Sequence, residues 1–133
     1  MTWELIDHTG DLAVVARAPT LEDLFADCAR AMFSILADAP APPRAESTDA
    51  FPVPGADPPE ELREFLGELL YRFSADHRMY VAFTPRQGSI DAAWEPYSPE
   101  RHPLRTELKA VTWHQLEAVR DGDAWRAKVI FDV

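Results

Sequence analysis

The residues best suited to chemistry lie near the start of the chain, in Asp7-His8-Thr9-Gly10-Asp11. Two carboxylates, an imidazole and a hydroxyl in one short segment could hold a cation, and carboxylates suit Mg²⁺, Ca²⁺ or Mn²⁺. The segment separates two runs typical of strands, which predicts a loop, and Gly10 would let that loop turn sharply. An Asx-type turn in which Asp7 caps local amides explains the same residues, and spacing alone favours this simpler interpretation.

A further carboxylate stands at the other end of the sequence, in Val129-Ile130-Phe131-Asp132-Val133. Aspartate is rare in strands, and the carboxylate of Val133 follows that of Asp132, so two negative groups lie close together. A bound cation would relieve their repulsion. Chain ends are often frayed and solvated, but an apolar run that reaches the last residue indicates an end tied into a sheet.

The third candidate segment is Lys109-Ala110-Val111-Thr112-Trp113-His114. Strand alternation predicts that its odd-numbered residues face one side of a sheet and its even-numbered residues the other. A lysine or an imidazole near a carboxylate cluster could contact an anionic ligand. A strand-edge lysine and a hydrogen-bonded core histidine are the plainer interpretations of Lys109 and His114.

Signatures of the common enzyme classes are absent from the sequence. It contains no G-x-G-x-x-G, P-loop, G-x-S-x-G, H-E-x-x-H or C-x-x-C motif. Nothing in the spacing supports a Ser/His/Asp triad, and His77 and His102 lie beside predicted loops without a functional signal. The sequence therefore offers a possible cation site but no catalytic motif.

Composition places the chain among globular proteins with an acidic surface. Its 133 residues are 47% hydrophobic and carry a net charge of −10, which predicts one domain spanning residues 1–133. Phosphate backbones would be repelled, whereas a basic protein partner or cations would be attracted, although solubility alone explains most of these charges.

The sequence has no apolar run long enough for a bilayer and no signal-peptide pattern, so we expect no membrane association and a cytoplasmic location. The single Cys28 excludes an internal disulfide, and we expect it to fill space in a helix.

Two helices are predicted by apolar residues that recur at three- and four-residue intervals. The first follows a capping-box-like pair, Thr20 and Asp23, and runs to about Ala37. The second begins near Pro59, because proline suits a first helical turn. Prolines fill the connection between the helices, where residues 51–53 could form a short edge strand.

The remaining regular segments read as strands, at residues 3–6, 11–18, 79–83, 89–94, 108–118 and 125–133. We expect the last two to form a hairpin around Arg120-Asp121-Gly122-Asp123, because Asp-Gly is a strong hairpin signal. Strands that come in hairpins build a mostly antiparallel sheet. We therefore predict a two-layer α+β fold in which the two helices cover one face of that sheet.

Five segments follow one another along the chain in a recognisable order. They are D-H-T-G-D before a strand, the helix T-L-E-D-L-F-A-D-C-A-R-A-M-F, the helix E-L-R-E-F-L-G-E-L-L-Y-R-F, the strand K-A-V-T-W-H and the terminal V-I-F-D-V. Together they resemble the archease family over nearly the whole chain. Gly10 stands where that family usually has alanine, and Pro19 where a polar residue often precedes the capping threonine.

The resemblance implies a protein cofactor that is not itself an enzyme. Archeases activate the GTP-dependent RNA ligase that joins 2′,3′-cyclic-phosphate or 3′-phosphate ends to 5′-hydroxyl ends in tRNA splicing and RNA repair. They promote guanylylation of the ligase's active-site histidine and support multiple turnover. The implied partner is therefore this ligase, and RNA would be met only indirectly.

The resemblance also implies a divalent metal site. The family's metal ligands, the second aspartate of the H-T-x-D motif and the C-terminal aspartate, match Asp11 and Asp132, and Val133 would supply a further oxygen. Lys109 matches the lysine of the family's K-A-V-T motif and Asp7 matches its first acidic position, so both are functional candidates by resemblance. His8 and His114 are neighbouring candidates to which the resemblance assigns no role. Oxygen ligands do not discriminate between Ca²⁺, Mg²⁺ and Mn²⁺.

Two alternatives use the same residues. A stand-alone metal-dependent phosphoesterase would take His8 or His114 as its base, and its mark is turnover of a phosphoester by the purified protein. A general chaperone or interaction module would hold a purely structural metal, and its mark is stimulation of unrelated clients whether or not the metal is present.

Overall fold

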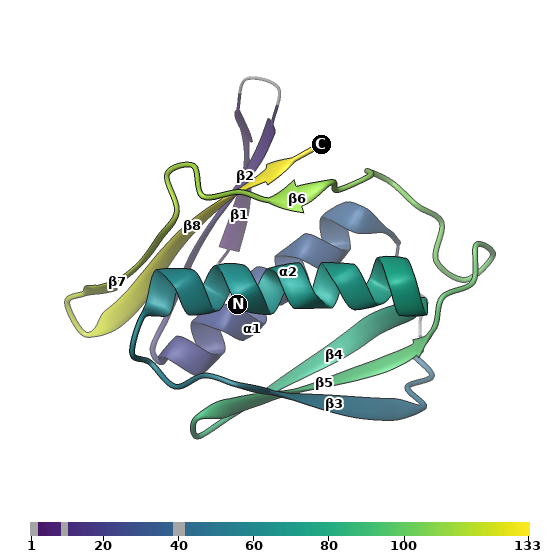
Figure 1. The fold of residues 1–133 in the computed structure, drawn as a ribbon, viewed down its shortest axis with the longest axis horizontal. Coiled ribbons are helices and arrows are strands. Elements are labelled where there is room, and N and C mark those ends of the chain that lie inside the picture. The colour runs from purple at the N-terminus through teal and green to yellow at the C-terminus, as the bar shows by residue number, and fades with distance from the viewer. Residues whose placement is uncertain (1–2, 9–10, 39–41) are drawn as a thin grey trace.

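Two helices lie between two antiparallel sheets in the computed structural model (Figure 1). The structure describes residues 3–8, 11–38 and 42–133, with only the backbone of residues 7 and 8. The α+β class and the antiparallel pairing are confirmed. The strands do not form the one sheet predicted from sequence, however, because they divide into a five-stranded and a three-stranded sheet.

The five-stranded sheet contains the first and last strands of the chain. Its members are β1 (Trp3–His8), β2 (Asp11–Ala18), β6 (Ala110–Val111), β7 (Glu117–Asp121) and β8 (Ala124–Asp132). They are ordered β1-β2-β8-β6, and β7 also pairs with β8. The predicted hairpin around the Asp-Gly dipeptide is confirmed, since β7 and β8 are joined at Gly122, whose φ of 66° suits glycine.

The three-stranded sheet has the order β3-β5-β4, with β3 (Ser47–Pro52), β4 (Arg78–Arg86) and β5 (Ser89–Pro96). The predicted edge strand near residues 51–53 is confirmed, although it begins earlier, at Ser47. Pro52 has no N–H to donate, and among the described strands β3 pairs only with β5.

The helix α1 (Leu21–Leu36) begins and ends next to its predicted bounds, and α2 (Pro58–Asp76) begins one residue before the predicted start. Thr20 caps α1 as expected, because its Oγ1 accepts the N–H of Asp23 at 3.1 Å. At the start of α2, the carboxylate of Glu61 accepts the N–H groups of Gly55 and Asp57, both at 2.7 Å. Within the described residues, neither helix is long and apolar enough to cross a membrane.

One hydrophobic core joins both helices to both sheets. Its centre is a group of aromatic rings with centroids 5.3 to 6.3 Å apart, formed by Phe25, Phe33, Phe51, Phe65, Tyr80 and Phe83. Cys28 is 1% exposed on α1, which confirms its role as a space-filling side chain. Burial against both sheets explains why α1 is apolar around most of its circumference.

Two local predictions were wrong. The segment from Asp7 to Asp11 is mostly strand and not loop, because His8 ends β1 opposite Asp11, which begins β2. Residues 9 and 10 lie outside the described residues.

The expected strand 108–118 is broken between β6 and β7. There Gln115 adopts a left-handed φ of 52°, and the Thr112 hydroxyl donates to the Ile130 carbonyl at 2.9 Å and accepts the His114 N–H at 3.2 Å.

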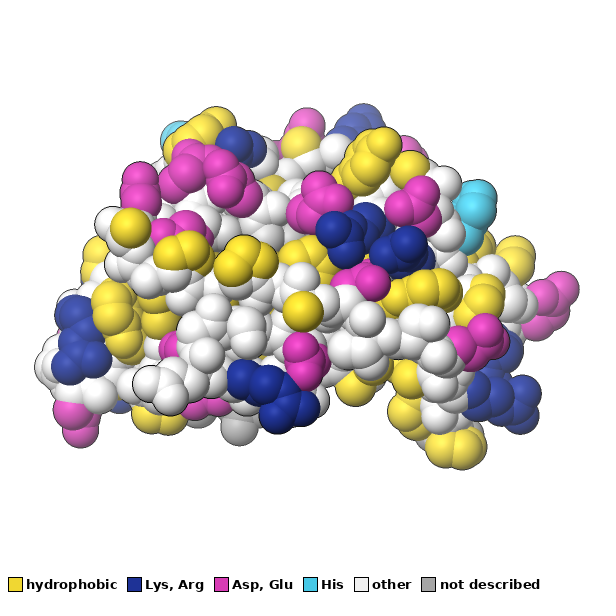
Figure 2. Space-filling view, turned by 60° about the horizontal axis from the view of Figure 1, so that its bottom comes forward, with side chains coloured by type: hydrophobic (Ala, Val, Ile, Leu, Met, Phe, Trp, Pro, Cys, Tyr) yellow, Lys and Arg dark blue, Asp and Glu magenta, His cyan; other side chains and the backbone are white. Residues whose placement is uncertain are grey.

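The charged groups of the smaller sheet are paired with one another. Asp49 accepts hydrogen bonds from Tyr80 Oη at 2.6 Å and Arg78 at 2.8 Å, and Arg72 lies 3.4 Å away. Burial and the Asp49 hydrogen bond raise the pKa of Tyr80 to about 12. On the face seen in Figure 2, basic side chains likewise lie beside acidic ones. Mutual neutralisation here explains these side chains without a ligand.

Candidate metal centre

Asp11 and Asp132 lie directly opposite each other on neighbouring antiparallel strands. The register of β2 and β8 pairs Asp11 with Asp132 and Leu12 with Phe131. Directly opposed residues point to the same face of a sheet with Cβ atoms about 5 Å apart. The pairing of the first and last strands therefore brings together two carboxylates that are 121 positions apart in the sequence.

The end of β8 is held on both sides. On one side it pairs with β2, and on the other Ala110 of β6 pairs with Asp132. The N–H of Lys109 also donates to the Asp132 carbonyl, at 2.8 Å. The expectation that the apolar C-terminal run is tied into the sheet is confirmed, and Asp132 has a fixed place between β2 and β6.

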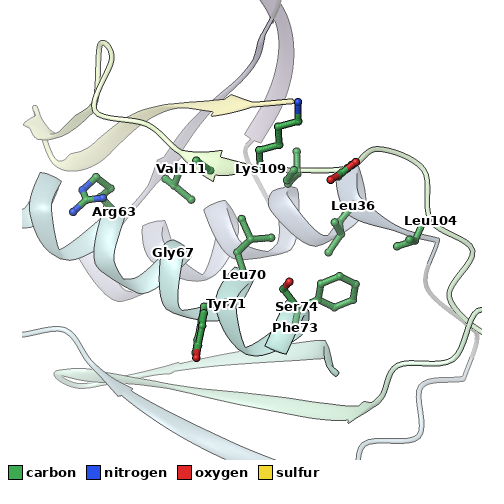
Figure 3. A pocket seen from close by; sticks show the side chains of 13 residues that line it. Leu36, Arg63, Gly67, Leu70, Tyr71, Phe73, Ser74, Leu104, Lys109 and Val111 are labelled. Atoms are coloured by element: carbon green, nitrogen blue, oxygen red, sulfur yellow. The ribbon is translucent and has the colours of Figure 1, made fainter. Parts of the chain in front are cut away.

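Lys109 precedes β6 and lies beside the end of β8 through its backbone. Its side chain is exposed and extends away from α2 toward the end of β8 (Figure 3). The predicted alternation of this segment is wrong beyond β6, because Val111 is only 8% exposed whereas Trp113 is 61% exposed. The strand break after Val111 is the reason.

The two histidine candidates and Asp7 are placed differently. The backbones of Asp7 and His8 lie opposite Leu12 and Asp11, but their side chains lie outside the described residues. His114 is exposed, in the connection that leads from β6 to β7. It is therefore not the core histidine considered from sequence. The sheet does not place it beside Asp132 either, since β7, which follows it, pairs with β8 only from Lys128 to Ala124.

The chemistry of the paired carboxylates fits a hard divalent cation. Like charges directly opposite each other destabilise a sheet, and a cation between them would offset this repulsion. Among the described side chains, no group of three His, Cys, Asp or Glu residues gathers at one place. The remaining ligands of a cation held by Asp11 and Asp132 would therefore be water molecules or other oxygens, and not further acidic side chains that the structure describes. A site of this kind suits Mg²⁺ and Mn²⁺ as well as Ca²⁺.

A buried polar cluster that no sequence motif marks lies beside the smaller sheet. Glu95 is 3% and His102 0% exposed, with His102 Nε2 3.2 Å from Glu95 Oε2 but outside hydrogen-bond geometry. His102 Nδ1 accepts the Ser98 N–H at 3.0 Å, which places the ring proton of the neutral form on Nε2. Arg101 and the Arg44 N–H bond the Glu95 carboxylate, both at 2.9 Å.

This cluster fastens the proline-rich loop after β5. Burial raises the pKa of Glu95, but the Arg101 and Arg44 hydrogen bonds outweigh burial and hold that pKa below its ordinary value. No periodicity or motif marks His102, because its burial comes from long-range contacts of an irregular segment. The cluster is therefore structural and separate from the carboxylate pair.

Comparison with known proteins agrees with the fold and with the order of the motifs. The model of the Archease protein family matches residues 3–133. The protein archease of Methanopyrus kandleri is 33% identical over 141 aligned positions, which cover 100% of both chains. The protein archease of Methanosarcina acetivorans is also 33% identical, over 98% of this chain and 95% of its own.

Two solved structures share the architecture. The solution structure of Methanobacterium thermoautotrophicum protein 1598 has a TM-score of 0.80 and 26% identity, covering 98% of each chain. The crystal structure of an archease and possible chaperone from Thermotoga maritima has a TM-score of 0.69, covers 98% of this chain and 96% of its own, and at 19% identity bears on the fold alone. Fold and paired carboxylates thus define a small α+β protein with both terminal strands in one sheet. The chain belongs to the archease family.

Proposed function

We propose that this protein binds a divalent cation through Asp11 and Asp132 and activates a GTP-dependent RNA ligase in tRNA splicing or RNA repair. The observation that carries the proposal is the direct cross-strand pairing of the two carboxylates. Membership of the archease family supports a role exercised on another protein. Activation would consist of faster guanylylation of the ligase and repeated turnover.

Each residue of the centre has its own proposed role. Asp11 and Asp132 would hold the cation, and an oxygen of Val133 would complete the protein's share of the ligands. When bound, the cation supplies a positive charge that attracts a phosphate oxygen. Lys109, anchored to Asp132 through its backbone, would contact an anionic group brought by the partner. Asp7 and His8 lie next to the pair in sequence and remain supporting candidates.

The acidity of the chain favours a protein partner over RNA. With a net charge of −10, long-range electrostatics oppose contact with a phosphate backbone, so RNA would be bound by the ligase. The phosphoesterase alternative has less support from the family match than the activator role, and of its two candidate bases only His8 has its backbone opposite a carboxylate of the pair, Asp11. A catalytic base must reach the reacting group.

A guanylylation assay tests the proposal. Purified ligase and labelled GTP are mixed with the protein, with Mg²⁺, Mn²⁺ or Ca²⁺ added separately, and covalently labelled ligase is followed in time. We expect the protein to accelerate labelling. The Asp11→Ala and Asp132→Ala variants should lose at least about tenfold of the stimulation, because even the loss of a residue that only supports a metal ligand costs about tenfold or more.

A matched control distinguishes the site from general loss of charge. Asp123 lies in the β7–β8 turn with a fully exposed side chain, so Asp123→Ala removes the same charge elsewhere and should stimulate like the wild type. Stimulation that survives both Asp11→Ala and Asp132→Ala would refute the metal site. No stimulation by the wild-type protein with any of the three cations would refute the activator role.

A further inference from the structure

A groove of about 550 Å³ runs along α2, between this helix and residues 104–111 (Figure 3). Leu36, Leu70 and Val111 are among its apolar lining residues. Tyr71 and Leu104 also line it, yet these side chains are 63% and 58% exposed. The volume lies within the range of ligand-binding clefts, and exposed large apolar side chains along a cleft are typical of interaction sites. We call this feature the α2 groove.

A glycine in the middle of α2 keeps the groove open. Gly67 lies well inside the helix, where glycine is less favourable than alanine. A Cβ atom built at Gly67 would meet nothing within 4 Å, so packing inside the protein does not require glycine there. The missing side chain leaves the helix backbone accessible from the groove.

The charge of the groove differs from that of the whole protein. Arg63 and Lys109 are its basic lining residues and Glu107 is its acidic one, whereas the chain has 23 acidic and 13 basic residues. Arg63 forms an ion pair with Glu60 at 3.1 Å and stacks 4.0 Å above the ring of Trp113, whose side chain is 61% exposed, whereas no ion pair is seen for Lys109 among the described residues. An apolar occupant with acidic groups would therefore match the groove better than the rest of the surface.

The groove adjoins the carboxylate pair. Lys109 and Ala110 line the groove, and both contact the end of β8, since Ala110 pairs with Asp132 and the Lys109 N–H donates to its carbonyl. In Figure 3 the Lys109 side chain leaves the groove toward the end of β8. A chain segment lying in the groove would thus hold its protein within reach of Asp132.

We propose that the α2 groove docks an apolar segment with acidic side chains that belongs to the protein partner. The identity of that partner as the GTP-dependent RNA ligase rests on the function proposed above. Apolar side chains of the segment occupy the space over Gly67, between Leu70 and Val111. An acidic group at the end of the segment nearest β8 meets Lys109, and the aromatic rings of Tyr71 and Trp113 flank the segment. Docking then positions the partner's reacting groups at the carboxylate pair.

Substitution of Gly67 separates docking from folding. Gly67→Leu fills the groove with a side chain that has free space, and Gly67→Ala does so to a smaller extent. Both should fold, with the midpoint of thermal unfolding raised by about 3 °C for Gly67→Ala, because alanine is the better helix former. Ala75→Leu is the matched control, since Ala75 is exposed on the same helix and does not line the groove.

The measurement is the affinity of each full-length variant for purified ligase, by biolayer interferometry, beside the guanylylation assay. We expect Gly67→Leu to weaken binding at least about tenfold and Ala75→Leu to bind within twofold of the wild type. If Gly67→Leu binds the ligase with wild-type affinity, the groove is not the docking site for the ligase. The groove would then be empty or occupied by a second copy of the chain. If the wild type binds but does not stimulate guanylylation, the proposed function fails while Gly67→Leu still tests the groove.

Discussion

Replacing Asp132 by asparagine tests the cation site by the sign of a stability change. In metal-free buffer the substitution removes one of two like charges on directly opposed residues. Two unit charges about 5 Å apart repel by about 1 kcal/mol in water. Asp132 is exposed, so salt and solvent reduce the expected gain to about 0.5 kcal/mol. This corresponds to a rise of about 2 °C in the midpoint of thermal unfolding.

Addition of the cation should reverse the order of the two proteins. A ligand at about 100 times its Kd stabilises the folded state by about 2.7 kcal/mol, which raises the wild-type midpoint by about 8 °C. Asp132→Asn keeps one carboxylate of the pair and gains much less. The variant is therefore more stable than the wild type without the cation and less stable with it.

The assay is thermal unfolding followed by circular dichroism, first with a chelator and then with Mg²⁺, Mn²⁺ or Ca²⁺. Asp123→Asn serves as control, because it removes a fully exposed charge in the β7–β8 turn and should shift with each cation as the wild type does. An equal cation-induced shift in the wild type and Asp132→Asn would refute the reasoning, as would a wild type that responds to none of the three cations.

Two further predictions concern buried groups. The pKa of Glu95 is held below its ordinary 4.5, so its ion-pair contribution is present above about pH 4.5 and is lost as pH falls through the folded-state pKa. Glu95→Gln should lower the free energy of unfolding at pH 7 by about 2 kcal/mol and flatten its decline in acid, measured by urea unfolding; an unchanged acid slope would contradict this. Burial raises the pKa of Cys28 to about 12, so a thiol-specific disulfide reagent at about pH 8 should label the protein only after unfolding. Labelling of the native protein at the rate of a free thiol would show that the helix opens.

Local signals in the sequence predicted most of the regular elements. Thr20 and the apolar spacing after it located α1, and the Asp-Gly dipeptide at Gly122 located the final hairpin. These features depend on hydrogen bonds and turn geometry within a few residues. The break after Val111 gave no such signal, because Gln115 adopts a left-handed φ without being glycine. The Thr112 hydroxyl, which supports the break, donates to the carbonyl of Ile130 on another strand.

Sequence and tertiary structure contributed differently to the site. The sequence alone supplied the candidate ligands, since the carboxylates of Asp11 and Asp132 are of a type that suits a hard cation, and the motifs around them indicated the family. Only the tertiary structure decided that β2 and β8 pair with these residues directly opposite. A shift of one residue in that register would turn one carboxylate to the opposite face.

The same division holds beyond the site. Helical spacing alone predicted α2, but not that Gly67 would lie open to a groove beside Lys109, nor that His102 would be fully buried against Glu95. Nor did the hairpins indicate that their strands would divide between two sheets around α1 and α2. Each of these features depends on contacts between segments far apart in the chain. Residue types near one another in sequence determine local structure, while packing of distant elements determines which of their side chains meet.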